Sequence, residues 1–334
     1  MTKITVIGAG AWGTALAVAA SHMNSQVALW GREEDGVDET NRLRENKQFL
    51  PGAKLPDSIF VTSNREVIRE ADLVILAVPA QKMRFIMTNF KDDIFHDTPL
   101  IITSKGIEQR NHCLMTDVLT EIFPRNPLAV LSGPTFAKEV GRGLPAGCTL
   151  AAENITTREF IIKSLSSPQF RLYGSADMVG AQVGGAVKNV MAIATGIAVG
   201  LGHGENAVSA LISRALVEMT RFGMAFGALP ETFMGLCGVG DLMLTCSSPT
   251  SRNHRYGVAL GKGLKVGEEF EGSTLVEGFF TTESVVAIAQ KLGVTLPICE
   301  FVDSILNQGV SVEKAAEFLL KRPYKTEEID FKVA

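Results

Sequence analysis

The chain has 334 residues, a formal net charge of −4 and a hydrophobic content of 46%. This length, about twice the ~150 residues of an average domain, predicts two domains with a substantial apolar core. The mild acidity argues against a general nucleic-acid or anionic-membrane binder, although it allows a local basic pocket. Five cysteines without a C-x-x-C pair favour free thiols in a reducing compartment over a disulfide framework or a cysteine zinc site.

No targeting segment is expected at the amino terminus, because the first apolar strand begins by Ile4. The longest charge-free stretch near the middle, residues 189–204, is shorter than the ~20 apolar residues of a membrane-spanning helix. We therefore expect a packed helix there and a soluble, cytoplasmic protein.

The first half of the chain alternates short apolar, β-branched runs with helical segments. The runs predict strands at Ile4–Ile7, Val27–Trp30, Ile59–Thr62, Leu73–Val78, Leu100–Ser104, Leu128–Leu131 and Thr149–Ala152. Several runs are apolar on both faces, as in a parallel sheet covered by helices. The alternation predicts a doubly wound α/β sheet.

After about Gly180 the pattern changes to amphipathic helices, with one apolar stripe from Ala207 to Phe222. Later helices are expected to start near Ser251, Thr282, Pro297 and Ser311. We therefore predict an α/β dinucleotide-binding domain at residues 1–180, joined directly to an all-helical substrate domain at residues 181–334.

A G-x-G-x-x-G motif follows the first predicted strand and opens a helix. Gly8 permits the tight turn, Gly10 lets a pyrophosphate approach the backbone, and Gly13 allows close helix–strand packing. The free N–H groups of the helix would bind the anion. In this strand–turn–helix context the motif strongly predicts dinucleotide binding.

The end of the second predicted strand should meet the adenine ribose. Arg32 stands there and could pair with a 2′-phosphate, whereas Glu33 and Glu34 disfavour one. We therefore favour NADP(H) slightly over NAD(H). A solvated loop arginine is the alternative interpretation of Arg32.

Lys188 lies inside a helical segment that has little other charge, one turn after Gly184 and Gly185. Interior glycines cost helix stability, so the pair suggests that something approaches this backbone closely. Desolvation lowers the pKa of a lysine and makes its amine a usable base near neutral pH. The alternative is a lysine that snorkels to the surface.

Four further segments place polar groups at strand ends or helix starts. They are Ser104–Gly106, Ser132–Ala137, Gly238–Asp241 and Thr250–Arg255. Each alone is typical of a turn, a cap or a solvated face. Together they predict a site for a small phosphorylated molecule.

Six motifs distributed over essentially the whole chain carry a family resemblance: G-A-G-A-W-G-T-A-L-A, S-K-G-I-E, S-G-P-T-F-A-K-E-V, G-G-A-V-K-N-V-M-A, G-x-G-D-L-x-L-T-C and S-R-N-H-R. With them the sequence resembles the bacterial-type NAD(P)-dependent glycerol-3-phosphate dehydrogenases. The resemblance implies a Rossmann-type domain followed by an all-α domain like that of 6-phosphogluconate dehydrogenase. It also implies interconversion of sn-glycerol 3-phosphate and dihydroxyacetone phosphate with NADP(H) or NAD(H), mainly to supply phospholipid synthesis.

Matching positions then imply the roles of individual residues. Lys188 would be the proton acceptor. Substrate contacts are implied at Lys105, Gly133, Thr135, Lys188, Asp241, Ser251, Arg252 and Asn253. Dinucleotide contacts are implied at Ala11, Trp12, Arg32, Lys105, Ala137, Arg252, Leu275 and Glu277. Val199 and His203 depart from the family pattern beyond these contact positions, so they concern helix packing or loop closure.

The mechanistic hypothesis gives Lys188 the hydroxyl proton while a hydride leaves the same carbon for the nicotinamide. Lys105 would lower the pKa of Lys188, and Asp241 would orient the lysine or a substrate hydroxyl. Ser251–Asn253 would hold the phosphate as a remote anchor. No metal is expected, and analogy with this architecture suggests a homodimer.

Two alternatives stay open on the sequence alone. A β-hydroxyacid or 6-phosphogluconate-type dehydrogenase tends to have an amide one turn after the lysine, whereas here Asn189 is adjacent and Ala192 lies one turn on. A non-catalytic dinucleotide sensor would keep the glycines but would have no need of Lys188 together with residues 251–253.

Overall fold

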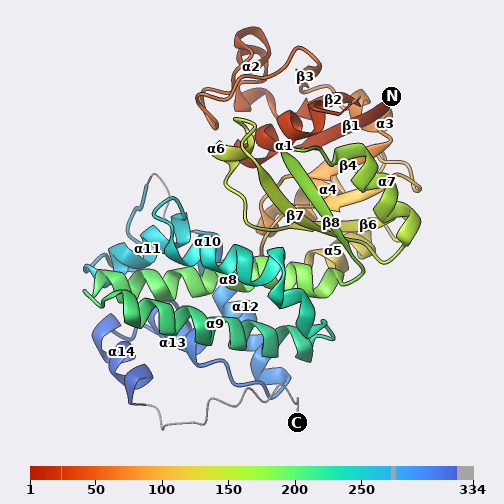
Figure 1. Ribbon diagram of the computed structural model, residues 1–334. Helices are drawn as coiled ribbons and strands as arrows, with labels where there is room; N and C mark the ends of the chain where they lie inside the picture. Colours follow the sequence, from red (N-terminus) through yellow and green to blue (C-terminus); the bar gives the residue numbers. More distant parts are fainter. Residues whose placement is uncertain (24, 272–275, 322–334) are drawn as a thin grey trace. The chain divides into compact units, whose positions relative to one another are not determined.

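The computed structural model describes the chain except residues 24, 272–275 and 322–334 (Figure 1). It contains two compact units. The first comprises Met1–Ser104 and Met115–Met178, and the second comprises Lys105–Leu114 and Val179–Ala334. The predicted boundary at residue 180 divides the chain once, whereas the structure also assigns the short segment 105–114 to the second unit. Its Ile107 and Leu114 side chains are buried in the apolar core of that unit.

One eight-stranded sheet forms the centre of the first unit, in the order β3-β2-β1-β4-β5-β6-β7-β8. Its strands are β1 (Thr2–Ile7), β2 (Ser25–Trp30), β3 (Ile59–Thr62), β4 (Leu73–Leu76), β5 (Leu100–Ile102), β6 (Leu128–Ser132), β7 (Ala146–Ala151) and β8 (Phe170–Ser175). Every residue of β4 and β5 is buried, as expected for strands covered on both faces. The predicted α/β class is confirmed.

Two features of the sheet differ from the prediction. Strand β8 was not predicted, because an edge strand with alternating buried and exposed residues has no continuous apolar run. Strand β7 runs antiparallel to β6, while all other neighbours are parallel. The connection 133–145 contains only the one-turn helix α6 (Ala137–Val140) rather than a full crossover helix, and the chain returns antiparallel.

The connections between the other strands are mostly helical. They contain α1 (Ala11–Ser21), η1 (Glu33–Asp35), α2 (Val37–Leu43), α3 (Glu66–Arg69), η2 (Ala80–Lys82), α4 (Met83–Thr88), α5 (Met115–Ile122) and α7 (Ile155–Leu165). Helix α1 buries eight consecutive residues, Gly13–Ala20, in the core of this unit. The glycine-rich turn before α1 is thereby fixed at the end of β1.

The second unit is helical in its described residues, apart from an isolated β-bridge between Glu108 and Cys113. Its elements are α8 (Met178–Gly200), α9 (Glu205–Ala225), η3 (Pro230–Met234), η4 (Leu236–Gly240), α10 (Asp241–Ser247), α11 (Arg252–Gly261), α12 (Glu277–Lys291), α13 (Pro297–Leu306) and α14 (Val312–Leu320). Helix α8, labelled in Figure 1, has 23 residues. It is apolar and long enough to cross a membrane, but 83% of its apolar window is buried inside the protein, as in a core helix.

The predicted helix starts are mostly confirmed. Ser251 and Ser311 are N-caps whose side chains accept backbone N–H bonds, and Pro297 stands in the first turn of α13. The predicted start near Thr282 is wrong. Thr282 lies within α12, where its hydroxyl donates to the carbonyl oxygen of Gly278 at 2.6 Å. Its side chain therefore bonds to the backbone of the preceding turn instead of capping the start of the helix.

Candidate active site

The glycine-rich turn of the first unit has no room for larger residues at two of its three positions. Gly8 has φ +113°, and a Cβ there would lie 2.5 Å from the carbonyl oxygen of Ala77. A Cβ on Gly13 would lie 1.8 Å from the carbonyl oxygen of Gly8. A Cβ on Gly10 would meet nothing within 4 Å, so this side of the turn is open. The geometry agrees with the tight turn predicted at Gly8 and the close packing predicted at Gly13, and the open space at Gly10 leaves room for the predicted ligand approach.

A cavity of about 1060 Å³, here called the cofactor cavity, opens in front of this turn. Gly8, Arg32, Ser63, Ala77 and Thr103 line it, and each directly follows or lies shortly after the carboxyl end of a strand from β1 to β5. Ligands of open α/β sheets bind at this edge. Of the predicted dinucleotide contacts, the cavity wall contains Gly8, Gly10, Ala11, Trp12 and Arg32.

The cofactor cavity fits a dinucleotide on local grounds. The N-cap of α1 is Gly10, which makes no side-chain cap, and the first turn of α1 contains no acidic residue. The first N–H groups of a helix lack intrahelical acceptors and carry partial positive charge. The open face at Gly10 therefore suits a pyrophosphate, and the cavity volume suits a ligand of that size.

Three further predicted residues of the first unit stand after β6. The hydroxyl of Thr135 donates to the carbonyl oxygen of Gly133 at 3.2 Å. Ala137 begins α6, which packs against α1, and its side chain contacts the same core as Ala11 and Trp12. None of the three is among the residues that line the cofactor cavity.

In the second unit, Gly184 explains how Lys188 acquires its partners. A Cβ on Gly184 would lie 2.2 Å from the carbonyl oxygen of Cys237, so only glycine lets η4 pack against α8 here. Residue Asp241 follows η4 as the first residue of α10. The close approach expected from the glycine pair is thus made by the chain itself, and it brings Asp241 beside Lys188.

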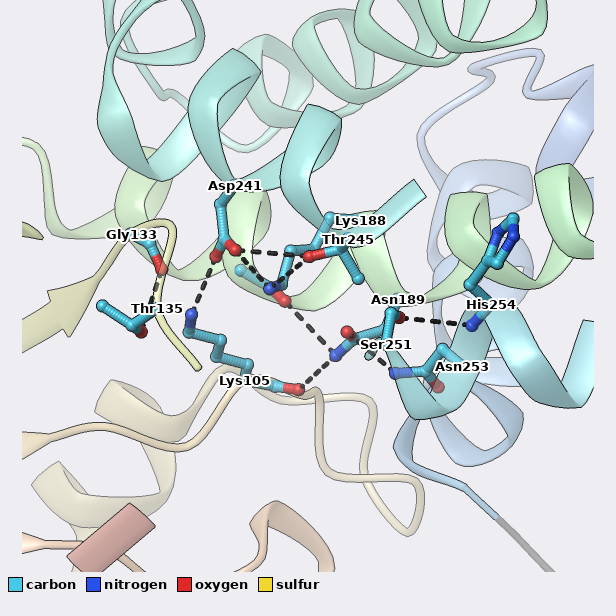
Figure 2. Close-up of polar contacts among 11 residues, drawn as sticks. Lys105, Gly133, Thr135, Lys188, Asn189, Asp241, Thr245, Ser251, Asn253 and His254 are labelled. Atoms are coloured by element: carbon cyan, nitrogen blue, oxygen red, sulfur yellow. Dashed lines mark hydrogen bonds and ion pairs between the residues drawn. The ribbon is translucent and has the colours of Figure 1, made fainter. Parts of the chain in front are cut away.

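Four side chains then form what we call the lysine cluster: Lys105, Lys188, Asp241 and Thr245 (Figure 2). The Lys188 Nζ donates to Asp241 Oδ1 at 2.5 Å and to Thr245 Oγ1 at 2.9 Å. The Lys105 Nζ donates to the other oxygen of Asp241 at 2.8 Å. One fully buried carboxylate therefore holds two ammonium groups, and Lys188 retains a third N–H for another acceptor.

Burial and charge set the protonation of Lys188. Its side chain is buried, and this desolvation is the largest of the effects that together lower its pKa from 10.5 to about 8. The negative charge of Asp241 opposes the shift, and the positive charge of Lys105 contributes to it. The snorkelling alternative is wrong, because Lys188 is only 6% exposed. An amine with this pKa exists in appreciable amounts as both base and acid near neutral pH.

The N-terminus of α11 places the predicted phosphate ligands. Ser251 is the N-cap and accepts the backbone N–H of His254 at 3.2 Å. Arg252 is the first residue of the helix, and its side chain is exposed. Asn253 is the next residue of the helix, and its side chain donates to Asn189 Oδ1 and accepts the backbone N–H of Gly278. The first turn of α11 contains no acidic residue, which favours an anion there.

A row of amide hydrogen bonds connects α12 to Lys105, and Figure 2 shows its part from Asn253 through Asn189 to Lys105. The Gly278 N–H donates to Asn253 Oδ1 at 2.9 Å, and Asn253 Nδ2 donates to Asn189 Oδ1 at 3.0 Å. Asn189 Nδ2 donates to the carbonyl oxygen of Lys105 at 3.1 Å. Each amide fixes the orientation of the next, so α11 and the Lys105 backbone are held in one network.

The remaining predicted positions are less informative. Glu277 is the first residue of α12, and Leu275 lies outside the described residues. Val199 is 39% exposed in the last turn of α8, and His203 follows that helix. Within the described part of the chain, no group of three His, Cys, Asp or Glu side chains is arranged to hold a metal ion.

Sequence reasoning missed several residues of these sites. Thr245 lies one turn after Asp241 on the same face of α10, a spacing that could have identified it. Phe49 and Arg65 line the cofactor cavity from loops with no motif. The sequence feature that could have identified Arg65 is its position three residues after the end of β3.

Two family models match the chain, NAD-dependent glycerol-3-phosphate dehydrogenase N-terminus over residues 3–158 and C-terminus over residues 177–317. The chain belongs to this family. It is therefore an oxidoreductase that depends on NAD(P)+. The β-hydroxyacid-type dehydrogenase and the non-catalytic sensor considered above are set aside by this membership.

Individual relatives agree with the family models. Glycerol-3-phosphate dehydrogenase (NAD(P)+) of Parvibaculum lavamentivorans is 46% identical over 97% of this chain and 98% of its own length. The protein of the same name from Caulobacter vibrioides is 47% identical over the same shares. The crystal structure of glycerol-3-phosphate dehydrogenase from Coxiella burnetii has a TM-score of 0.91 at 36% identity, covering 96% of this chain and 99% of its own.

Proposed function

We propose that Lys188 exchanges a proton with the substrate as the enzyme interconverts sn-glycerol 3-phosphate and dihydroxyacetone phosphate. The observation that supports this role is the lysine cluster, in which a buried amine with a pKa of about 8 has one N–H left for an oxygen of the substrate. Proton transfer by a positioned group works best when its pKa lies near the working pH.

The direction of proton transfer follows from the charge on Lys188. In alcohol oxidation its neutral amine accepts the hydroxyl proton, and in ketone reduction its ammonium group donates a proton to the developing alkoxide. A bound NAD(P) supplies the hydride chemistry at C4 of its nicotinamide ring. Lys105 adds a second positive charge that stabilises the alkoxide oxygen.

Asp241 is the positioning residue of this arrangement. It accepts from both lysines through separate oxygens, at 2.5 Å and 2.8 Å, and therefore fixes the two ammonium groups relative to each other. It also keeps Lys188 basic enough to accept a proton, since its negative charge raises the pKa of that amine.

We assign the phosphate of the substrate to the N-terminus of α11. Arg252 supplies an exposed cation, while the Ser251 cap and Asn253 present polar groups from an anchored backbone. Binding energy at this remote group positions the reacting carbon. Gly133 and Thr135 are proposed as further substrate contacts, and Ala137 and Glu277 as dinucleotide contacts.

In the cell this reaction would supply glycerol phosphate for phospholipid synthesis. The homodimer expected from the architecture stays a prediction.

The test is a steady-state assay of the purified enzyme with dihydroxyacetone phosphate and each reduced nicotinamide cofactor. Dihydroxyacetone without phosphate and a β-hydroxyacid serve as comparison substrates. The proposal expects turnover of the phosphorylated ketone with a kcat/KM at least about a thousandfold above the unphosphorylated one, since the anchor contributes to orientation. Comparable turnover of both ketones would contradict the phosphate assignment.

A further inference from the structure

The guanidinium group of Arg32, on the wall of the cofactor cavity, is bound by carboxylates of its own turn. Its Nε and Nη2 donate to Asp35 at 3.2 and 2.8 Å, and its Nη1 pairs with Glu34 at 2.8 Å. This cavity-facing arginine was expected from the sequence to meet a 2′-phosphate. In the structure, the planar fork that would bind such a phosphate is directed at the carboxylates instead.

The Asp35 contact is built into the local fold, and the Glu34 contact is not. Asp35 Oδ2 also accepts the backbone N–H of Arg32 at 2.9 Å, which closes the turn η1. The Asp35 side chain is 13% exposed, whereas that of Glu34 is 66% exposed. Burial alone would raise the pKa of Asp35, but the hydrogen bonds from Arg32 outweigh it and hold that pKa below its ordinary value. Asp35 is therefore an ionised, fixed partner, and Glu34 is a weak surface partner.

Arg65, on the same cavity wall, is engaged in a similar way. Its Nη1 donates to Asp93 at 3.2 Å and to the carbonyl oxygen of Asn89 at 2.9 Å, and its guanidinium lies 4.6 Å from the centre of the Phe90 ring. Asp35 and Glu33 themselves line the cavity. The two arginines of this wall are thus accompanied by carboxylates.

A 2′-hydroxyl and a 2′-phosphate meet these groups differently. A hydroxyl can donate a hydrogen bond to a carboxylate and needs no cation. A phosphate must share Arg32 with Asp35, whose like charge repels it. We infer that Asp35 is a specificity-determining residue that restrains binding of the 2′-phosphorylated dinucleotide by holding Arg32. This inference rests on the proposed binding of NAD(P) in the cofactor cavity, and it assigns to Asp35 a role that the sequence did not suggest.

The test measures binding of two adenosine ligands to the full-length enzyme by calorimetry, independently of turnover. The probes are adenosine 2′,5′-bisphosphate and AMP, which differ only in the 2′-phosphate. The variant Asp35→Asn keeps an oxygen for the Arg32 N–H but removes the charge. We expect its affinity for the bisphosphate to rise about tenfold, while its affinity for AMP stays within about twofold. The ratio of kcat/KM for NADPH and NADH should move in the same direction.

Two control variants separate the local effect from net charge. Glu70→Gln makes the same change in charge at a surface ion pair with Lys3, outside the cofactor cavity, and should leave the affinity ratio unchanged. Glu34→Gln should change the ratio by about twofold at most. If Asp35→Asn loses thermal stability, Asp35→Ser, whose hydroxyl can also cap the Arg32 N–H, provides the second measurement.

Three outcomes overturn the inference. An unchanged bisphosphate affinity in Asp35→Asn removes Asp35 as a determinant. A weakened one shows instead that Asp35 prepares Arg32 for the phosphate. An equal gain when Asp35→Asn is made in an Arg32→Ala background shows that Arg32 is not the intermediary. If wild-type enzyme bound neither AMP nor the bisphosphate, the cofactor cavity itself would be misassigned, which is a failure of the proposed function.

Discussion

The two units build their sites in different ways. The turn of the first unit uses consecutive residues, Gly8 to Gly13, and the groups proposed to bind the dinucleotide are backbone N–H groups at the start of α1. The lysine cluster of the second unit uses side chains from three separate segments, at residues 105, 188 and 241–245. A backbone site is therefore encoded in one short motif, whereas a side-chain site depends on how helices pack.

The largest effect is expected when Lys188 is replaced, because the proposal gives proton transfer to this residue and nucleotide binding to the first unit. Lys188→Ala should lower kcat by about 10²- to 10⁴-fold, the usual contribution of a general acid or base. Its Kd for NADH or NADPH should stay within about twofold of the wild-type value. A variant that kept more than about a tenth of the wild-type rate would refute the assignment.

Gly184→Ala tests whether helix packing creates the lysine cluster. The new Cβ would stand 2.2 Å from the Cys237 carbonyl oxygen, so η4 and Asp241 must move. We expect a loss of about 1–3 kcal/mol in unfolding free energy and a fall in kcat of about tenfold or more. Gly204→Ala is the matched control, since its Cβ would meet nothing within 4 Å. Equal effects of the two substitutions would speak against the packing argument.

The pH profile tests the electrostatics of the cluster. Because the neutral amine of Lys188 is the base, kcat for alcohol oxidation should rise through about pH 8, and kcat for ketone reduction should fall through the same pH. Lys105→Gln removes a charge that lowers this pKa, so both midpoints should move upward by about one unit. A midpoint that stayed in place or moved down would show that the amine does not sense Lys105.

The smallest effect concerns a buried carboxyl away from either site. Desolvation raises the pKa of Glu218 from 4.5 to about 8, although the N–H groups of Ile298 and Cys299 and the charge of Arg221 oppose the shift. Between these pH values the folded protein keeps a proton that the unfolded chain releases, so stability should fall as pH rises. Glu218→Gln should flatten this dependence by about 1 kcal/mol per pH unit, measured by denaturant unfolding from pH 5 to 8. Parallel curves for the two proteins would contradict the shift.

How much the sequence predicts follows the same division. The tight turn at Gly8 and the close packing at Gly13 were predicted from one short motif and agree with the structure, whereas the ligand approach at Gly10 stays a prediction. The edge strand β8 and the antiparallel turn into β7 were missed, since pairing partners are set by the whole sheet. For the second unit, the glycines before Lys188 indicated a close approach, but nothing in the pattern identified η4 as the neighbour.

The side-chain contacts within both sites could not be predicted from the sequence either. Arg32 was recognised, yet its pairing with Asp35 depends on the turn η1, which a run of acidic residues does not specify. The amide row through Asn189 and Asn253 joins positions far apart in the chain. The partners in this row of hydrogen bonds depend on which helices pack against one another.

Chemical rescue of Lys188→Ala by added primary amines is the most direct test of the central claim. The account predicts that kcat rises in proportion to the concentration of a small alkylamine. The pH dependence of the rescued rate should follow the pKa of the added amine rather than the value near 8 of the wild-type enzyme. If the variant bound substrate and NADH normally, and no amine of any size or pKa restored turnover, Lys188 would not be the group that moves the proton.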